Sequence, residues 1–158
     1  MYRLIVALLL LLGATPAISQ IVGEPNIVNG VCDSQSGVTI DDSESSQFGC
    51  DTAVITRNQR GTVLIQFTDK RGDDGRILGF AGTIEGKQGF GADAVQMLGV
   101  ERLYLTGGGE PISISRGTCI MNWSGLQRTG GRLTSVLCAA RGQADGSDIK
   151  AMVVLKVR

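Results

Sequence analysis

The stretch DIKAMVVLKV, residues 148–157, decides the fold class because its apolar side chains recur at every second position. The apolar side chains of one face are Ile149, Ala151, Val153, Leu155 and Val157. Two lysines, Lys150 and Lys156, lie on the other face. This period of two predicts a β-strand with one face turned to a core.

Similar patterns recur upstream, separated by segments rich in Gly, Asp and Ser. Strands are expected at residues 53–56, 62–68, 77–84, 112–123 and 133–140. Turns or loops are expected at residues 69–75, 86–91, 106–111, 124–132 and 141–147. Seven or eight short strands without a long helix predict an all-β fold, a small antiparallel β-sandwich or barrel with Gly-rich turns and disulfides.

Residues 94–98 fit two structures. Asp93 could cap a short helix with Val95 and Leu98 facing inward. Alternatively, residues 95–105 form one strand that bends at Gly99. We favour the strand, because residues 100–105 have too little helical spacing.

The N-terminus has the pattern of a secretory signal peptide. The apolar run LIVALLLLL, residues 4–12, follows Arg3 and precedes the small residues Ala17 and Ser19. Because a membrane span needs roughly 20 residues, we expect cleavage after Ser19 rather than an uncleaved anchor. The expected organisation is a signal peptide over residues 1–19, a flexible segment over 20–30 and a single β domain over 31–158.

Four cysteines follow the signal: Cys32, Cys50, Cys119 and Cys138. An exported chain meets an oxidising compartment, so an even number of cysteines predicts disulfides. Of the three possible connectivities we favour Cys32–Cys50 and Cys119–Cys138, because each pair flanks a short loop rich in turn residues. The alternative, a zinc site with four cysteine ligands, lacks the closely spaced pairs that such sites use. We expect a periplasmic or secreted protein.

Composition argues against several function classes. The 15 basic residues balance the 15 acidic ones, so the overall charge exerts no pull toward nucleic acid or anionic lipid. The chain has no histidine, which excludes Ser-His-Asp and Cys-His catalysis and His-ligated metal sites. The carboxylates cluster in two expected loops, at Asp41, Asp42 and Glu44 and at Asp69, Asp73 and Asp74. We interpret both clusters as solvated loops, and no catalytic residue, cofactor or metal site is predicted.

The segment 121–132 is the best candidate for a binding surface. It holds the only tryptophan, Trp123, together with Arg128 and Arg132, between two cysteines expected to pair. A braced loop with Trp and Arg suits partner binding, because these residues carry much interface energy. The alternative is that Trp123 packs over the disulfide in the core.

We therefore expect an exported, non-catalytic binding module that acts on a protein or envelope component. The alternative is a structural or surface envelope protein that self-assembles. Nucleic acid is not an expected partner, the mature chain is expected to have no transmembrane segment, and the sequence leaves the oligomeric state open.

Overall fold

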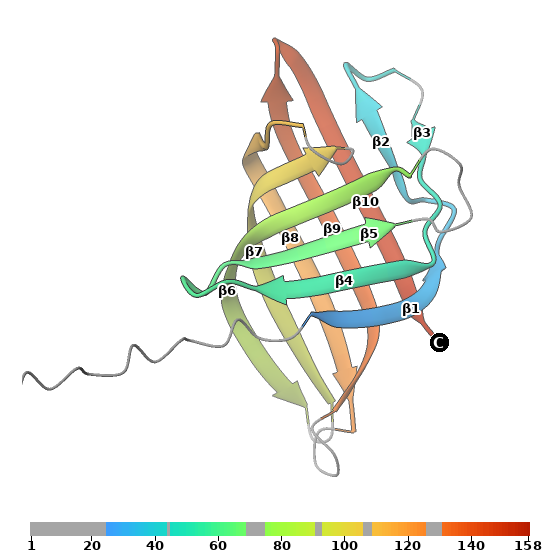
Figure 1. The fold of residues 1–158 in the computed structure, drawn as a ribbon, viewed down its shortest axis with the longest axis vertical. Coiled ribbons are helices and arrows are strands. Elements are labelled where there is room, and N and C mark those ends of the chain that lie inside the picture. Colours follow the sequence, from blue (N-terminus) through green and yellow to red (C-terminus); the bar gives the residue numbers. More distant parts are fainter. Residues whose placement is uncertain (1–24, 44, 69–74, 91–92, 106–108, 126–130) are drawn as a thin grey trace, which may run out of the picture.

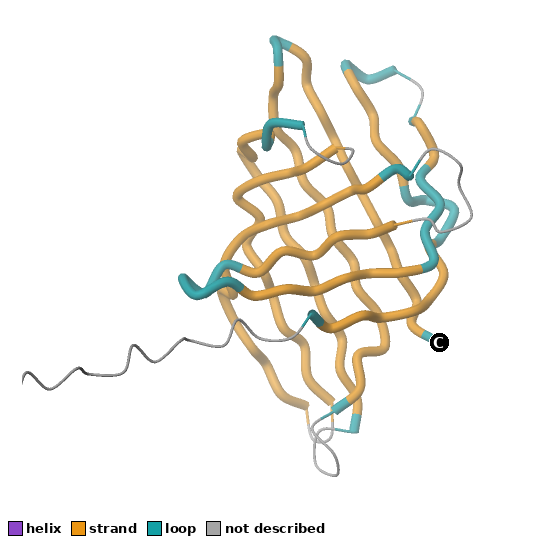
Figure 2. The backbone as a smooth tube through the Cα atoms, in the orientation of Figure 1, coloured by secondary structure: helices purple, strands orange, loops and turns teal. Residues whose placement is uncertain are grey.

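The computed structural model describes residues 25–43, 45–68, 75–90, 93–105, 109–125 and 131–158, and every regular element in these ranges is a β-strand (Figure 1; Figure 2). The strands are β1 (Asn26–Cys32), β2 (Gly37–Ile40), β3 (Ser46–Gln47), β4 (Thr52–Arg57), β5 (Val63–Thr68), β6 (Ile77–Phe90), β7 (Asp93–Leu105), β8 (Ile112–Ser124), β9 (Arg132–Ala144) and β10 (Ser147–Val157).

All ten strands belong to one antiparallel sheet, in the order β1-β4-β5-β6-β7-β8-β9-β10-β2-β3. Strand β1 pairs with β4 and also with β10, so the sheet curls until its pairing returns to its first strand. Strand β2 lies beside the first half of β10. Figure 1 shows β4, β5 and β6 crossing in front of β8, β9 and β10. The predicted all-β antiparallel fold is confirmed, with ten strands instead of seven or eight.

The core follows the period of two seen in the sequence. One row of the sheet consists of Leu98, Cys119, Cys138 and Val153, which occupy matching register positions on four neighbouring strands. All four side chains are fully buried. The alternate positions of these strands therefore face outward, and they form the outer surface on which the candidate site lies.

The strand over residues 95–105 is confirmed as part of β7, and the helix is not formed. The register of the neighbouring pairs shifts between Gly99 and Arg102, near the predicted bend. A Cβ atom on Gly82 of β6 would overlap the carbonyl oxygen of Gly99. Glycine at position 82 therefore permits the close approach of the two backbones at this bend.

Two predicted loops are wrong. Residues 86–90 extend β6, because their backbone pairs with β7, for example Lys87 with Gln96. Residues 141–144 likewise extend β9, and the turn to β10 is reduced to Asp145 and Gly146. Both turn residues have positive φ, 52° and 83°, as a two-residue hairpin turn requires. Glycine and polar content indicated loops, but hydrogen bonding to the neighbouring strand overrides that local preference.

Part of the segment predicted to be flexible is a strand. Strand β1 begins at Asn26, inside the segment 20–30 predicted to be flexible, because Ile27 and Val28 pair with β4. The predicted signal peptide, residues 1–19, lies outside the described residues.

Candidate binding groove on the outer face of the sheet

The structure describes two of the three predicted partner-binding residues. Trp123 lies near the end of β8 opposite Leu133, and its half-buried side chain packs against the hydrophobic core. Arg132 is exposed at the first position of β9. Arg128 lies outside the described residues. The core contact of Trp123 favours a role in folding, and the hairpin tip as a binding site stays a prediction.

Replacement of Trp123 distinguishes these two roles. We expect Trp123→Ala to lower the free energy of unfolding by about 2 kcal/mol, roughly half the cost of deleting a fully buried aromatic side chain. Urea unfolding followed by circular dichroism measures this. Arg132→Ala, at the same end of the hairpin, is the control and should change stability by less than about 0.5 kcal/mol. A Trp123 variant as stable as the wild type would instead support the hairpin tip as a binding surface.

Both predicted disulfides are confirmed. Cys119 and Cys138 join directly opposed positions of β8 and β9 inside the core. Cys32 and Cys50 join the end of β1 to the segment that leads into β4. With all four cysteines of the chain paired, none is left as a thiol nucleophile or zinc ligand. Two disulfides also indicate an oxidising compartment.

The first predicted carboxylate cluster attaches a turn to β10. Asp41 and Asp42 follow β2 with left-handed φ values of 50° and 56°. The Asp41 carboxylate accepts a hydrogen bond of 2.7 Å from the backbone N–H of Asp148, and the Asp41 N–H donates one of 2.9 Å to the Asp148 carbonyl. The Asp42 carboxylate accepts a hydrogen bond from the ammonium group of Lys150. The remaining predicted carboxylates, Glu44, Asp69, Asp73 and Asp74, lie outside the described residues.

The Asp42–Lys150 contact predicts an acid-sensitive stabilisation. The hydrogen bond from Lys150, and then its charge, hold the pKa of Asp42 below the ordinary 3.8. A lowered pKa stabilises the fold above the ordinary carboxyl pKa, and this stabilisation is lost as the pH falls through the lowered value. We expect NMR titration to place Asp42 below 3.8 and Lys150→Met to raise it. Lys156→Met, which removes the partner of Asp33, should leave Asp42 unchanged. Equal Asp42 midpoints in the wild type and Lys150→Met would contradict this prediction.

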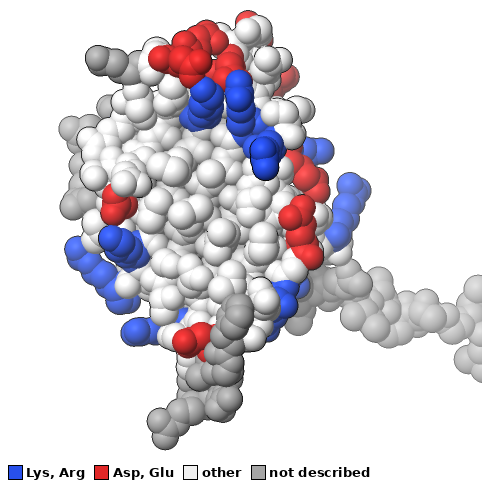
Figure 3. Space-filling view, turned by 180° about the vertical axis from the view of Figure 1, so that it is seen from behind, with Lys and Arg blue, Asp and Glu red and all other residues white. Residues whose placement is uncertain are grey.

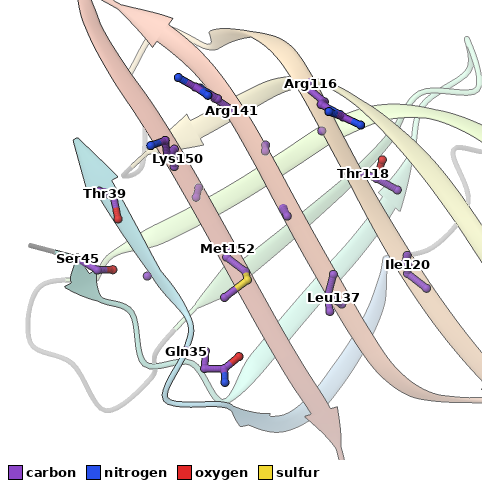
Figure 4. Close-up of a pocket in the computed structure, with 15 residues that line it drawn as sticks. Gln35, Thr39, Ser45, Arg116, Thr118, Ile120, Leu137, Arg141, Lys150 and Met152 are labelled. Atoms are coloured by element: carbon purple, nitrogen blue, oxygen red, sulfur yellow. The ribbon is translucent and has the colours of Figure 1, made fainter. Parts of the chain in front are cut away.

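A shallow groove with a volume of about 590 Å³ crosses the outer face of β8, β9, β10 and β2 (Figure 4). Its middle is formed by Thr118, Ala139, Met152 and Gly37, which occupy matching register positions on these four strands. Except for Met152, these residues have short side chains or none. The surface is therefore lower here than along the rows on either side.

One side of the groove is apolar. Ile120 of β8 lies opposite Leu137 of β9, and both are partly exposed groove residues. The same row continues beyond the groove to Met97 of β7, which is 42% exposed, and to Val154 of β10. We refer to Met97, Ile120, Leu137 and Val154 as the apolar row. It gives the outer face a continuous strip without charge.

The opposite side of the groove carries three cations. Arg116, Arg141 and Lys150 are neighbours on β8, β9 and β10, and we call them the cation row. Figure 4 shows them gathered at one end of the groove, with Ile120 and Leu137 toward the other. A second hollow, of about 690 Å³, also includes Arg116 and Arg141 in its lining. The groove is thus polarised from a charged end to an apolar end.

The three cations differ in their partners. The Arg141 guanidinium makes two contacts of 2.9 Å with the Asp148 carboxylate, and this hydrogen bonding raises the pKa of Arg141. Lys150 contacts Asp42 and lies 3.8 Å from Asp148. The guanidinium of Arg116 is exposed and makes no hydrogen bond or ion pair with any side chain or backbone group that the structure describes. Since Asp148 and Asp42 balance the charges of Arg141 and Lys150, the guanidinium of Arg116 is the cation at this end of the groove that no described carboxylate engages.

Figure 3, which views the molecule from behind Figure 1, shows a broad uncharged centre with charged residues around its margin. Partly exposed apolar side chains in a continuous patch commonly mark an interaction surface. This surface was not predicted from the sequence, although Met152-Val153-Val154-Leu155 is apolar on both faces of its strand. Such a run signals a strand that is covered on both sides.

Comparison of the chain with protein-family models, curated proteins and solved structures gave no match. In the described ranges there is no helix long and apolar enough to cross a membrane.

Proposed function

We propose that the protein is an exported, non-catalytic binding module that acts on an envelope component or protein in the periplasm or outside the cell. The observation that carries this proposal is the polarised outer groove, in which partly exposed Ile120 and Leu137 line one side and the cation row lines the other. An apolar surface with a few polar groups at one end has the composition of a ligand site. The signal pattern and the two disulfides support export.

The chemistry of the groove favours binding over catalysis. Its ionisable lining residues are the basic residues Arg116, Arg141 and Lys150, and no carboxylate is among them. General acid–base catalysis works best with a group whose pKa lies near the working pH. The exposed guanidinium of Arg116, which no described carboxylate engages, instead suits recognition of an anionic group.

Self-assembly as a structural protein is the second candidate. The uncharged apolar row could also pack against another copy of the chain. However, the sheet edges that usually lead to strand-by-strand assembly are restricted here. Strand β1 pairs with β4 along residues 26–29 and with β10 along residues 30–32, and the terminal strand β3 has only two residues.

The proposal is tested by partner capture with the oxidised, exported protein and matched variants. Ile120→Asn places an amide in the groove, and Leu64→Asn makes the same kind of change on β5, where Leu64 is also partly exposed. After circular dichroism confirms folding, each protein is cross-linked in an envelope extract of the producing cells. We expect Ile120→Asn to lose at least about tenfold of the captured partner, as burial of one aliphatic side chain predicts, and Leu64→Asn to retain it.

Two results would contradict this. If Ile120→Asn and Leu64→Asn capture the same partner as the wild type, the groove is not the binding surface, and Trp123 and Arg132 become the next residues to replace. If the wild type sediments as large assemblies that Ile120→Asn disperses, the protein is the self-assembling component instead.

A further inference from the structure

We infer that the outer groove binds a single anionic amphiphile, a molecule with one linear apolar chain and one phosphate or carboxylate head group. This inference rests on the proposed function and names its ligand class. The groove is polarised along its length, with charge at one end and aliphatic side chains toward the other (Figure 4). A ligand that fills it must have the same polarity.

The charged end has capacity for an anion. Arg116 and Arg141 are directly opposite each other on neighbouring strands, an arrangement that repels unless an anion lies between them. Asp148 engages Arg141, but no described carboxylate engages Arg116. The guanidinium of Arg116 can therefore donate to a phosphate or carboxylate oxygen without breaking an ion pair. Arg141 and Lys150 lie beside it, but Asp148 and Asp42 already balance their charges, so Arg116 is the main partner for the head group.

The rest of the groove has the length of a medium acyl or alkyl chain. Arg141 and Leu137 lie four residues apart on the same face of β9, a distance of about 13 Å, or roughly ten chain carbons. Ala139 lies between them, with Thr118 and Met152 beside it. These residues offer methyl and thioether groups to the chain. None of the fifteen groove-lining residues is an aspartate or glutamate that would repel the head group.

The groove favours a single molecule over a bilayer surface. Its apolar side chains lie along the sheet, between Arg116 at one end and Ile120 toward the other, so a bound chain would lie parallel to the strands. A bilayer would present head groups to the whole face at once, and the uncharged centre in Figure 3 offers few cations to meet them. We therefore assign the site to a monomeric amphiphile.

Isothermal titration calorimetry with the oxidised, exported protein tests the inference, using decyl phosphate below its micelle concentration. We expect saturable binding of one molecule. Hexyl phosphate should bind about 16-fold more weakly, since a half-covered methylene contributes roughly a factor of two. Decanol and inorganic phosphate, which each lack half of the ligand, should bind much more weakly than decyl phosphate.

Matched variants locate the two ends of the ligand. Arg116→Gln should weaken decyl phosphate by about tenfold, the effect expected for a lost charged hydrogen bond, whereas Arg57→Gln at the exposed end of β4 should not. Ile120→Asn should reduce the difference between decyl and hexyl phosphate, and Leu64→Asn should preserve it. When decyl phosphate is added to the wild type, the amide chemical shifts of groove residues on β8 and β9 should change, from the charged end to the apolar end.

Several outcomes would overturn the inference. These are equal binding of inorganic phosphate and decyl phosphate, no effect of Arg116→Gln, or binding to anionic phospholipid vesicles without binding of the monomeric ligand. If decyl phosphate fails to bind while Ile120→Asn still abolishes partner capture, the groove takes a protein and only this inference fails. If Ile120→Asn also leaves partner capture intact, the proposed function fails with it.

Discussion

Phe80→Ala should lower the free energy of unfolding by about 3–5 kcal/mol, the cost of deleting a fully buried aromatic side chain. Phe80 is 0% exposed and lies between Ile65 of β5 and Leu103 of β7, which are equally buried. Its ring meets the ring of Phe67 edge to face, with centroids 5.9 Å apart and planes at 82°. Urea unfolding followed by Trp123 fluorescence and circular dichroism measures the loss.

The control is Leu64→Ala, on the outer face of the neighbouring strand β5. Leu64 is only partly buried, so its replacement should cost less than about 2 kcal/mol. A Phe80 variant that loses no more stability than Leu64→Ala would mean that the Phe80 ring is not tightly packed between β5 and β7.

Sequence alone predicted the parts of the fold in which alternation is strong. In β5, Val63, Ile65 and Phe67 are buried as their spacing indicated, and β10 follows the same rule. The three N-terminal strands were not predicted. Strand β3 has only two residues. Strands β1 and β2 both pair with β10, which lies more than 100 residues away in the sequence, and β1 also pairs with β4. A short segment with little alternation of its own carries no local signal of such pairing.

The groove could not be predicted from the sequence for a related reason, because its residues come from several strands. Thr118, Ala139 and Met152 come from three strands, and only the register of β8, β9 and β10 brings them into one row. The overall charge is equally uninformative, since the balance of 15 basic and 15 acidic residues does not reveal where cations gather. Arg116 and Arg141 are separated by 25 positions in the sequence, yet they are directly opposite in the sheet.

The two disulfides should differ in how much they stabilise the fold. Both close loops of similar length, with sequence separations of 18 and 19, so the chain-entropy contribution of each is about 3 kcal/mol. Cys119 and Cys138 are both 0% exposed, whereas Cys32 is partly exposed. Replacing the Cys119–Cys138 pair by alanines therefore also removes two packed sulfur atoms from the core. We expect that double variant to lose about 1 kcal/mol more than Cys32→Ala/Cys50→Ala.

Urea unfolding of the two double variants, each compared with the oxidised wild type, measures this difference. Cys119 and Cys138 also lie in the backbone directly between the groove residues Thr118 and Ile120 and between Leu137 and Ala139. Loss of their bridge should therefore weaken binding of decyl phosphate, while loss of the Cys32–Cys50 bridge should leave that binding nearly unchanged. Equal losses of stability in the two variants would show that the buried bridge acts only by restricting the unfolded chain. Unchanged binding of decyl phosphate after loss of the Cys119–Cys138 bridge would show that the groove keeps its shape without it.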